Sequence, residues 1–580
     1  MKIMGSSSSL IHNNPLISKS PTKLFTSSIK KNDVFSINFP FFHNIHHPFQ
    51  VGTMRVARSP GLTLENIKWP SPDDEIPFWE SSITTSHVTI EAPLSVDKDS
   101  DLMHVIHVTA EMAPIAKVGG LGDVVTGLAR ACLSRGHTVD IMLPFYECLP
   151  KQQMTEFNLI CTYDSYHDGK WVQTNAYRAV ASGIPVILIE PANQFFKGQR
   201  IYGGSYDELE AYLFFCRACL EYMQKPRIVL TIHNMEHYGE CRFVVSVLVE
   251  WNCELIKEQF GKSGLDGDVY ATTDKAVDDR TIGHNPERLS LLKGGIVYSN
   301  AVVTVSPSYL KETLGSGWLS CILIKYRDKY NGVLNGIDTS LWNPATDPFL
   351  SAKFDAQSLA GKTICKEYVQ RGLGLPIKFV GSDTHVKGKI PLVVCITRLV
   401  AQKGLHLIRH AIKHVEELGG QMVVLGRASN VQVEKEFESL ATLHNQGPSI
   451  RILLIYSEEL SHMLYAAADM VLVPSIYEPC GLAQMIGMRY GAVPIVRRTG
   501  GLADTVFDMD DQSKHEVSNG FVFEGIDEKS LSSAMDRAFN FYSNKPDEWQ
   551  KLVMKIMQID NSWNNAAEKY ISIYNSVRSY

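Results

Sequence analysis

The chain has 580 residues, of which 44% are hydrophobic and 20% are charged, and its formal net charge is −6. This length exceeds a single domain of ~100–200 residues, so we expect more than one domain. The acidic balance provides no basic field for nucleic acid, and no apolar run approaches the ~18 residues that a membrane helix needs.

The first 60 residues differ in composition from the rest. They are rich in serine and basic residues, and Asp33 is the only acid before Glu65. This composition is typical of an organelle transit peptide, and a plain disordered leader is the alternative. Residues 61–100 contain scattered prolines and acids and are predicted to be a linker.

From residue 104 onward, apolar strand-like runs alternate with helix-like stretches, which predicts parallel sheets covered by helices. In the first half we expect strands at 105–108, 139–143, 186–189, 228–232 and 302–305, and helices at 123–134 and 206–223. Ser306 and Pro307 then supply an N-cap and a first-turn proline for a further helix. The turn-rich passage 334–344 is predicted to be a hinge.

The second half repeats this pattern. Strands are expected at 392–396, 422–425, 452–455, 470–473 and 493–496, and helices at 404–418 and 459–467. Ligands of such open sheets bind beside the carboxyl ends of the strands. We therefore look for functional residues in the loops that follow each strand.

A related phrase occurs near both ends of the globular part, GGLGDV at 119–124 and GGLADTV at 500–506. Each copy follows a strand-like run and opens a helix-like stretch. Paired glycines let the backbone approach a ligand closely, and the helix start offers N–H groups to an anion such as a diphosphate. The repeat indicates two similar α/β halves that face one cleft, and two unrelated turns are the alternative.

Five charged or polar residues lie beside the predicted strand ends. Lys117 precedes the first glycine turn, Arg398 and Lys403 follow the strand at 392–396, and Glu478 follows the strand at 470–473. The cations suit a leaving diphosphate, and the carboxylate suits a sugar hydroxyl or a helix cap. His233 ends a first-half strand, where a structural role and a role at the cleft are both open.

Taken together, these phrases resemble the ADP-glucose-dependent starch and glycogen synthases, the family-5 glycosyltransferases, and most of all the plant soluble starch synthases. The resemblance runs from about His104 to Tyr580. The motifs that carry it are KVGGLGDV at 117–124, TIHNMEHYGE at 231–240, DDRTIGHNPERLSLLKGG at 278–295, LNGID at 334–338, TRLVAQKG at 397–404, PSIYEPCGL at 474–482 and RTGGLADTV at 498–506.

The resemblance implies a GT-B fold, in which two Rossmann-like domains face a cleft. It places an acceptor-side starch synthase domain at 101–340, a nucleotide-sugar domain at 341–558 and a C-terminal helix at 559–580 that crosses back. The implied reaction transfers glucose from ADP-glucose to the non-reducing end of an α-1,4-glucan, with retention. No metal or other cofactor is implied, and other starch-synthesis proteins are the implied protein partners.

The resemblance also assigns roles to individual residues. On the first domain, it implies that Lys117, Gly119 and Gly120 contact the donor, Asp123 shapes the acceptor side and His233 lies beside the transferred glucose. On the second domain, Arg398 and Lys403 would neutralise the diphosphate and Glu478 would hold glucose hydroxyls. The remaining implied donor-binding residues are Cys480, Gly481, Leu482, Thr499, Gly500, Gly501 and Leu502.

The chain departs from the family pattern at two neighbouring places. In the family, a strand, a His-x-His-(Asp/Glu)-Trp phrase and a helix separate the segments that match 206–222 and 227–231, whereas only Met223 to Pro226 stand there in this chain. We therefore expect the first domain to lack one strand–helix unit. Its sheet would then lack an inner strand, and its cleft would lack one wall. An apolar insert at 243–257, which the family does not have, follows soon after.

Two explanations fit both departures. Either a shortened exon and a retained intron in the gene model produced them, which we favour, or the chain is a genuine isoform whose insert fills the missing strand. These departures leave a second function open, a catalytically impaired glucan-binding or scaffold protein in starch granule formation. A sucrose-type synthase is a weaker third option. The leader predicts a plastid, either chloroplast or amyloplast.

Overall fold

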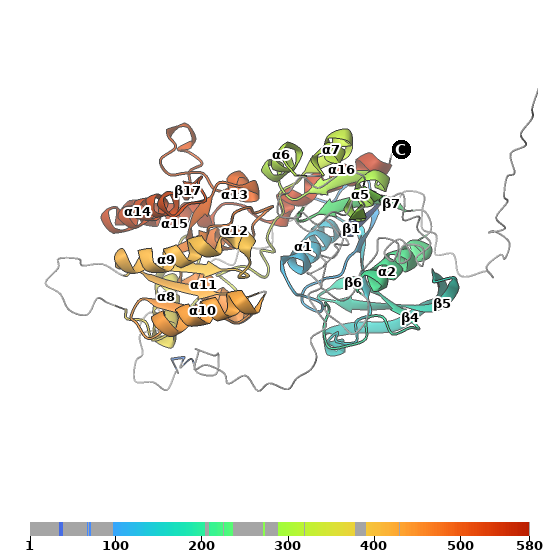
Figure 1. The fold of residues 1–580 in the computed structure, drawn as a ribbon, viewed down its shortest axis with the longest axis horizontal. Coiled ribbons are helices and arrows are strands. Elements are labelled where there is room, and N and C mark those ends of the chain that lie inside the picture. Colours follow the sequence, from blue (N-terminus) through green and yellow to red (C-terminus); the bar gives the residue numbers. More distant parts are fainter. Residues whose placement is uncertain are drawn as a thin grey trace, which may run out of the picture.

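In the computed structural model, two α/β lobes lie side by side (Figure 1). The structure describes residues 34–38, 67, 69–70, 97–202, 208–223, 226–235, 271–272, 288–289, 291–317, 319–377, 390–428 and 430–578. The insert at 243–257 and most of the leader and linker lie outside these residues. None of the helices in the described part of the chain combines the length and apolar character needed to cross a membrane.

The first lobe is built on a nine-stranded sheet with the order β11-β10-β7-β1-β2-β3-β6-β5-β4. Its strands are parallel except where β5 pairs with β4 and β6. The bounds are β1 Val34–Asn38, β2 His104–Val108, β3 Thr138–Pro144, β4 Met154–His167, β5 Lys170–Ala181, β6 Ile184–Pro191, β7 Arg227–Ile232, β10 Ala301–Thr304 and β11 Tyr330–Gly332. The long β4–β5 hairpin is an addition that we did not expect from the sequence.

The sheet does not lack an inner strand, contrary to our expectation. Strand β1, from the predicted leader, lies between β2 and β7 and is parallel to both. Val34 is paired with Val105 on one side and with Arg227 on the other. The physical reason is that β2 and β7 would otherwise have unpaired backbone N–H and C=O groups inside the sheet, and a β-branched and aromatic segment such as VFSIN can satisfy them.

This strand also corrects the expectation of a disordered leader at residues 34–38. The transit peptide itself stays a prediction, as does the absence of a strand–helix unit after Met223. The short link after α2, Glu208–Met223, leads directly into β7, and α2 itself connects β6 to β7 across the sheet. The chain can therefore make this crossover without a further helix.

Helices cover the first sheet, as the alternating pattern predicted. Their bounds are α1 Gly120–Ser134, α2 as above, α5 Leu291–Tyr298, α6 Pro307–Gly315 and α7 Ser320–Lys325. Helix α6 begins as expected, because the Ser306 hydroxyl accepts a hydrogen bond from the Tyr309 N–H at 3.1 Å and Pro307 is in the first turn. The two short strands β8 Ala271–Thr272 and β9 Arg288–Leu289 form a separate antiparallel pair.

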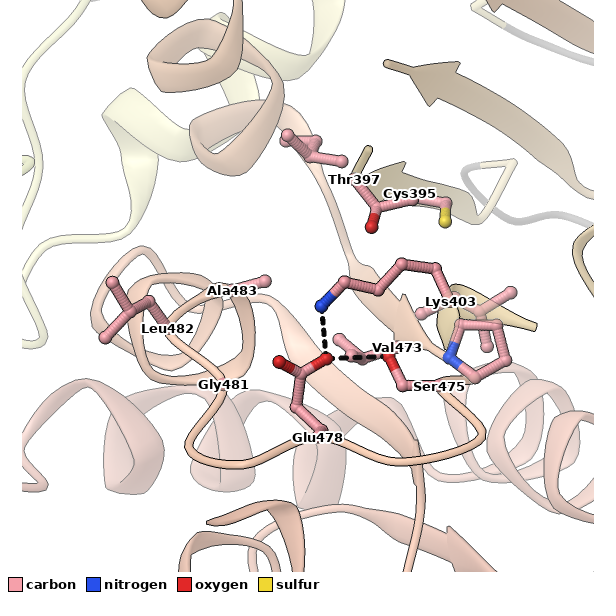
Figure 2. Close-up of a pocket in the computed structure, with 12 residues that line it drawn as sticks. Cys395, Thr397, Lys403, Val473, Ser475, Glu478, Gly481, Leu482 and Ala483 are labelled. Atoms are coloured by element: carbon pink, nitrogen blue, oxygen red, sulfur yellow. Dashed lines mark hydrogen bonds and ion pairs between the residues drawn. The ribbon is translucent and has the colours of Figure 1, made fainter. Parts of the chain in front are cut away.

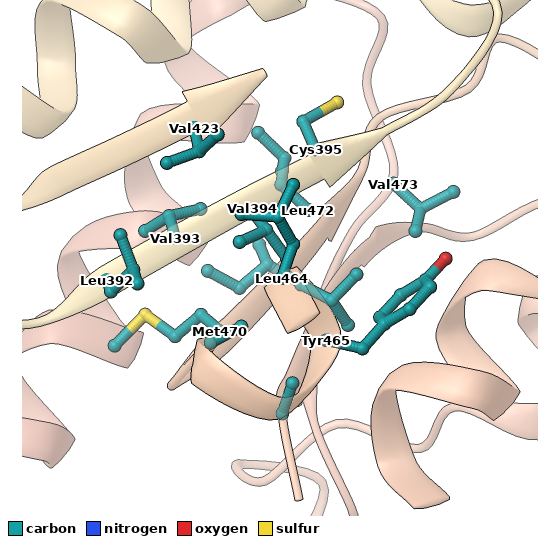
Figure 3. Close-up of a cluster of buried hydrophobic side chains, with 14 of the residues drawn as sticks. Leu392, Val393, Val394, Cys395, Val423, Leu464, Tyr465, Met470, Leu472 and Val473 are labelled. Carbon is teal, nitrogen blue, oxygen red and sulfur yellow. The ribbon is translucent and has the colours of Figure 1, made fainter. Parts of the chain in front are cut away.

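The second lobe is built on a fully parallel sheet with the order β14-β13-β12-β15-β16-β17. The bounds are β12 Leu392–Ile396, β13 Gln421–Leu425, β14 Ile450–Leu453, β15 Met470–Val473, β16 Val493–Arg497 and β17 Phe521–Phe523. The helices are α8 Ala360–Gly372, α9 Leu405–Glu417, α10 Val431–His444, α11 Glu458–Ala467, α12 Ala483–Arg489, α13 Gly500–Thr505, α14 Glu528–Asn544 and α15 Pro546–Met557. Figure 3 shows its core, where Val393 and Val394 of β12 lie near Val423, Leu464 and Met470.

The last helix, α16 Trp563–Arg578, returns to the first lobe. It packs against α1 and against strands β1 and β7. Trp563, Tyr570 and Tyr574 are buried in the hydrophobic core of the first lobe. The chain therefore crosses between the lobes twice, at the passage near 337 and before α16, and the Ile337 N–H donates to the Asn561 carbonyl at 2.8 Å where the two crossings meet.

Candidate active site

A small pocket of about 80 Å³ lies at the carboxyl edge of the second sheet, where open α/β sheets bind ligands. It is formed by the ends of β12 and β15 and by the loops that follow them. Its lining residues are Cys395, Ile396, Thr397, Lys403, Leu472, Val473, Pro474, Ser475, Glu478, Gly481, Leu482 and Ala483. Four of the residues that we predicted from the sequence, Lys403, Glu478, Gly481 and Leu482, therefore lie in one pocket.

Lys403 and Glu478 form an ion pair inside this pocket (Figure 2). The Lys403 ammonium donates to Glu478 Oε2 at 2.5 Å, and the Ser475 hydroxyl donates to the same oxygen at 2.7 Å. The following residue, Gly404, has a φ of 71° and lies so close to the Pro474 carbonyl that a Cβ would overlap it. A left-handed glycine is thus needed to bring the Lys403 loop against the Glu478 loop.

Arg398 is on the same side of the sheet but is arranged differently. It follows β12 by two residues, is exposed, and forms no ion pair with any residue in the described part of the chain. It does not line the pocket. The two predicted cations therefore differ, since Lys403 is held by Glu478 inside the pocket and Arg398 is open to solvent at its edge.

On the first lobe, Lys117 links the first glycine turn to the second lobe. Its ammonium is 3.0 Å from Asp123 Oδ1 and 3.1 Å from Glu458 Oε1 at the start of α11. Burial lowers the pKa of Lys117, but the carboxylates outweigh burial and the pKa lies above its ordinary value. For Asp123 the effect of burial is stronger than that of Lys117, so the pKa of this carboxyl is raised.

N–H groups of the first glycine turn donate hydrogen bonds to Glu111, a carboxylate that we did not predict from the sequence. Glu111 Oε2 accepts from the Val118 and Gly119 N–H groups, both at 2.9 Å, and Glu111 Oε1 accepts from the Tyr202 hydroxyl at 2.9 Å. Glu111 is buried. Its position, three residues after a predicted buried strand, is the signal that could have revealed it.

Gly120 brings the two lobes into direct proximity. A Cβ at this position would lie 3.5 Å from Cδ1 of Leu482, which lines the pocket of the second lobe. Gly120 of the first lobe therefore lies beside the pocket of the second lobe. Of the first glycine turn, Gly120 is the residue that lies beside Leu482, while Lys117 reaches the second lobe at Glu458.

His233 follows β7 at the edge of the first sheet, and burial lowers its pKa to about 4. The imidazole is therefore neutral near pH 7. Its neighbour Asn234 donates to the Gln402 side chain of the second lobe at 3.4 Å, so this strand end contacts the second lobe. A neutral histidine here can donate or accept a hydrogen bond but brings no charge.

The second glycine turn packs against the loop that contains Glu478. The Gly501 N–H donates to the Glu478 carbonyl at 3.0 Å, and a Cβ at Gly500 or Gly501 would overlap a carbonyl oxygen of that loop. Thr499, Gly500 and Gly501 do not line the pocket. The Gly500 N–H instead donates to Glu312 Oε1 of the first lobe at 2.8 Å, a second carboxylate that sequence reasoning missed.

Cys480 is buried, and burial raises the pKa of its thiol to about 12. A thiol with such a pKa stays protonated at neutral pH and is a poor nucleophile. Cys480 does not line the pocket, whereas its successors Gly481 and Leu482 do. The structure thus gives Cys480 a packing environment.

Comparison with known proteins agrees with this arrangement. The model of the family described as "Starch synthase catalytic domain" matches residues 104–226 and 222–319, and that of "Glycosyl transferases group 1" matches residues 382–553. The two matches to the first family meet at the link between α2 and β7.

Two relatives and one solved structure illustrate the similarity. The probable starch synthase 4 of Arabidopsis thaliana is 40% identical over 513 residues, which are 81% of this chain and 47% of that protein. A glycogen synthase of Protochlamydia amoebophila is 36% identical over 516 residues, 82% of this chain and 99% of that protein. The catalytic domain of starch synthase IV from Arabidopsis thaliana, solved with ADP and acarbose, is 39% identical with a TM-score of 0.74 and covers 83% of this chain and 100% of that domain.

The chain thus spans about half the length of the plant starch synthase 4 and nearly the whole of the bacterial glycogen synthase. The first family model covers most of the first lobe, and the second covers most of the second lobe. The chain belongs to the starch and glycogen synthase family and has the GT-B fold.

Proposed function

We propose that this chain is a starch synthase that transfers glucose from ADP-glucose to the non-reducing end of an α-1,4-glucan. The observation that carries the proposal is the Lys403–Glu478 pair, which lies in a pocket beside Gly120 of the first lobe. The plant and bacterial relatives are named as starch and glycogen synthases, and the similar solved structure contains ADP.

In the proposed reaction, the bond between the anomeric carbon and the phosphate oxygen breaks and ADP leaves with the electron pair. An acceptor hydroxyl then forms the new bond to that carbon on the same face and passes its proton to the leaving diphosphate, so the configuration is retained. Lys403 and Arg398 stabilise the charge that develops on the diphosphate, because fixed cations stabilise a charged transition state. Glu478 holds the glucose hydroxyls and keeps the Lys403 ammonium in place.

The first lobe supplies the other half of the proposed site. Lys117 and the Gly119–Gly120 turn contact the donor, and Asp123 shapes the acceptor side while holding Lys117. His233, neutral because burial lowers its pKa to about 4, offers a hydrogen bond beside the transferred glucose. On the second lobe, Gly481 and Leu482 line the sugar pocket, and the 499–502 turn supports it from behind.

We further propose that the protein acts in a plastid. The leader is rich in serine and poor in acids, and the plant relatives are described as chloroplastic or amyloplastic. A fusion of residues 1–60 to a fluorescent protein should accumulate in chloroplasts. A cytosolic signal would contradict this location, and a fusion of residues 1–30 alone would show whether the targeting information precedes β1.

The test of the activity is ADP release from ADP-glucose with glycogen as acceptor. It should use the full-length chain, because removing the first 60 residues would also remove β1 from the sheet. We expect turnover. A folded chain that binds glycogen without releasing ADP would instead indicate the scaffold function.

The departure after Met223 needs a separate experiment. Sequencing the transcript across residues 220–260 shows whether the shortened link and the insert at 243–257 exist in the cell. If the family segment is present in the transcript, the longer chain is the one to assay, and gain of ADP release on restoring that segment would trace the loss of activity to it.

A further inference from the structure

Helices α6 of the first lobe and α13 of the second pack against each other at the boundary between the lobes. They lie next to each other where the two lobes meet in Figure 1. Helix α13 begins at the second glycine turn, which supports the Glu478 loop. Contacts between these two helices can therefore link the position of the first lobe to the geometry of the pocket.

At this interface, each helix has a carboxylate that accepts hydrogen bonds from the other helix. Glu312 of α6 accepts from the Gly500 N–H at 2.8 Å and from the Thr499 hydroxyl at 3.3 Å, at the start of α13. Asp504 of α13 accepts from the Ser308 N–H at 2.9 Å and from the Ser308 hydroxyl at 2.7 Å, in the first turn of α6. Each helix thus caps the positive end of the other, a favourable place for a negative side chain.

The same part of α6 also contacts the Glu478 loop directly. The Ser306 hydroxyl donates to the Pro479 carbonyl at 2.7 Å, and Ser306 is buried. On the other side of that loop, the Gly501 N–H donates to the carbonyls of Glu478 and Pro479 at 3.0 and 3.2 Å. The peptide units that orient Glu478 are therefore held from both lobes.

We infer that Glu312 and Asp504 form a reciprocal clamp that holds the two lobes closed and positions the Glu478 loop for the donor. Both are positioning residues, since neither lines the pocket. This inference rests on the proposed function only in its kinetic consequence. The clamp itself is a property of the two helices and can be observed without turnover.

The clamp predicts a particular kinetic change. Loss of a carboxylate lowers the fraction of chains whose lobes are closed, and the apparent affinity for the donor falls by the same factor. Once the donor has bound, the closed site is unchanged. We therefore expect Glu312→Ala to raise KM for ADP-glucose by about fivefold to tenfold, the size expected for a hydrogen-bonded carboxylate that solvent partly screens, with kcat within about twofold.

Glu312 is exposed, so its replacement leaves no cavity and the variant should fold. Glu312→Gln keeps an oxygen that can accept from the Gly500 N–H and should recover part of the affinity. Lys311→Ala, an exposed neighbour on α6, is the matched control and should behave like the wild type. Unchanged KM in Glu312→Ala, or an equal rise in the Lys311→Ala control, would overturn the inference.

A second measurement separates the clamp from the proposed function. In the absence of ligand, Glu312→Ala combined with Asp504→Ala should increase the radius of gyration measured by small-angle X-ray scattering, because the lobes open. If the wild type releases no ADP, the proposed function fails while scattering still decides the clamp. If the wild type is active and the double variant has the same radius of gyration and KM as the wild type, the clamp fails and the function stands.

Discussion

At the scale of single residues, the pocket depends on a partly buried ion pair. The side chains of Lys403 and Glu478 are 16% and 10% exposed, so water screens their interaction only weakly. Removing one partner of such a pair leaves the other with an uncompensated charge, which costs more than the pair contributes. The pair is therefore a sensitive point for mutation.

Glu478→Gln should reduce turnover on the order of 10²-fold. The neutral amide binds the Lys403 ammonium less strongly than the carboxylate does, and it accepts weaker hydrogen bonds from the sugar hydroxyls. The measurement is kcat for ADP release from ADP-glucose. Glu434→Gln, on the exposed side of α10, is the matched control. Wild-type turnover in Glu478→Gln would remove this carboxylate from the active site.

The buried His107 leads to a separate prediction about how the stability of the protein depends on pH. His107 is fully buried in β2, neither ring nitrogen has a hydrogen-bond partner among the described residues, and burial lowers its pKa to about 4. The unfolded chain, with a pKa near 6.5, takes up the proton first as the pH falls. Stability present above about pH 6.5 is therefore lost progressively towards pH 4, by about 3 kcal/mol for such a shift.

His107→Leu, which is similar in volume, should abolish this part of the pH dependence. We expect the variant to exceed the wild type in free energy of unfolding at pH 5 by about 1–3 kcal/mol, since it also removes two unsatisfied polar atoms. Urea unfolding at pH 7.5 and pH 5 measures the difference. The exposed His515→Leu is the control, and equal pH slopes in the wild type and His107→Leu would refute the assignment.

At the scale of elements, strand β1 decides whether the first sheet is continuous. It supplies the partner that β2 and β7 need on their facing edges, and Ile37 is paired with Val108 on one side and Leu230 on the other. An inner strand of this kind cannot be replaced by solvent without exposing backbone groups in the sheet. The leader therefore has a structural part in addition to any targeting role.

Ile37→Pro should destabilise the first lobe by about 1–3 kcal/mol, since proline removes a backbone donor from an inner strand and leaves the carbonyl opposite it unpaired. Deleting residues 1–60 should have at least this effect, whereas deleting residues 1–30 retains β1 and should have little. The thermal unfolding midpoint of the full-length chain and the three variants measures this. Identical midpoints after deletion to residue 30 and to residue 60 would show that β1 is dispensable.

At the scale of the whole molecule, helix α16 ties the last segment of the chain to the first lobe. Trp563 lies against α1 at Gly127, where a Cβ would overlap the indole ring. The buried Tyr570 hydroxyl donates to the Asn335 side chain at 3.0 Å, beside the passage between the lobes. The relative position of the lobes thus depends on residues from both ends of the globular chain.

Gly127→Ala should force α16 away from α1 and destabilise the protein by about 1–3 kcal/mol, the usual cost of overpacking. Differential scanning calorimetry of the full-length chain measures the change. Gly315→Ala serves as the control, because a Cβ there meets nothing within 4 Å. An unfolding transition in Gly127→Ala that matches the control would contradict the packing of α16 on α1.

Much of the fold could be predicted from local pattern. The strand predictions at 392–396 and 470–473 coincide with β12 and β15, and most other predicted strands and helices differ from the observed elements by one to four residues at an end. These segments are short apolar runs or amphipathic stretches whose conformation depends mainly on near neighbours. The two glycine turns and the loops with Lys403 and Glu478 were recognisable for the same reason.

The tertiary structure alone decided which distant residues meet. Nothing in the leader indicated that VFSIN pairs with β2 and β7, because strand pairing depends on contacts remote in sequence. Glu312 reaches the second glycine turn from the other lobe, and only the fold shows that Glu111, which follows a predicted strand, bonds to the first turn. By itself, the sequence determined the elements, the family and the main candidate residues. The continuous first sheet and the carboxylates that hold the glycine turns exist only once the chain has folded.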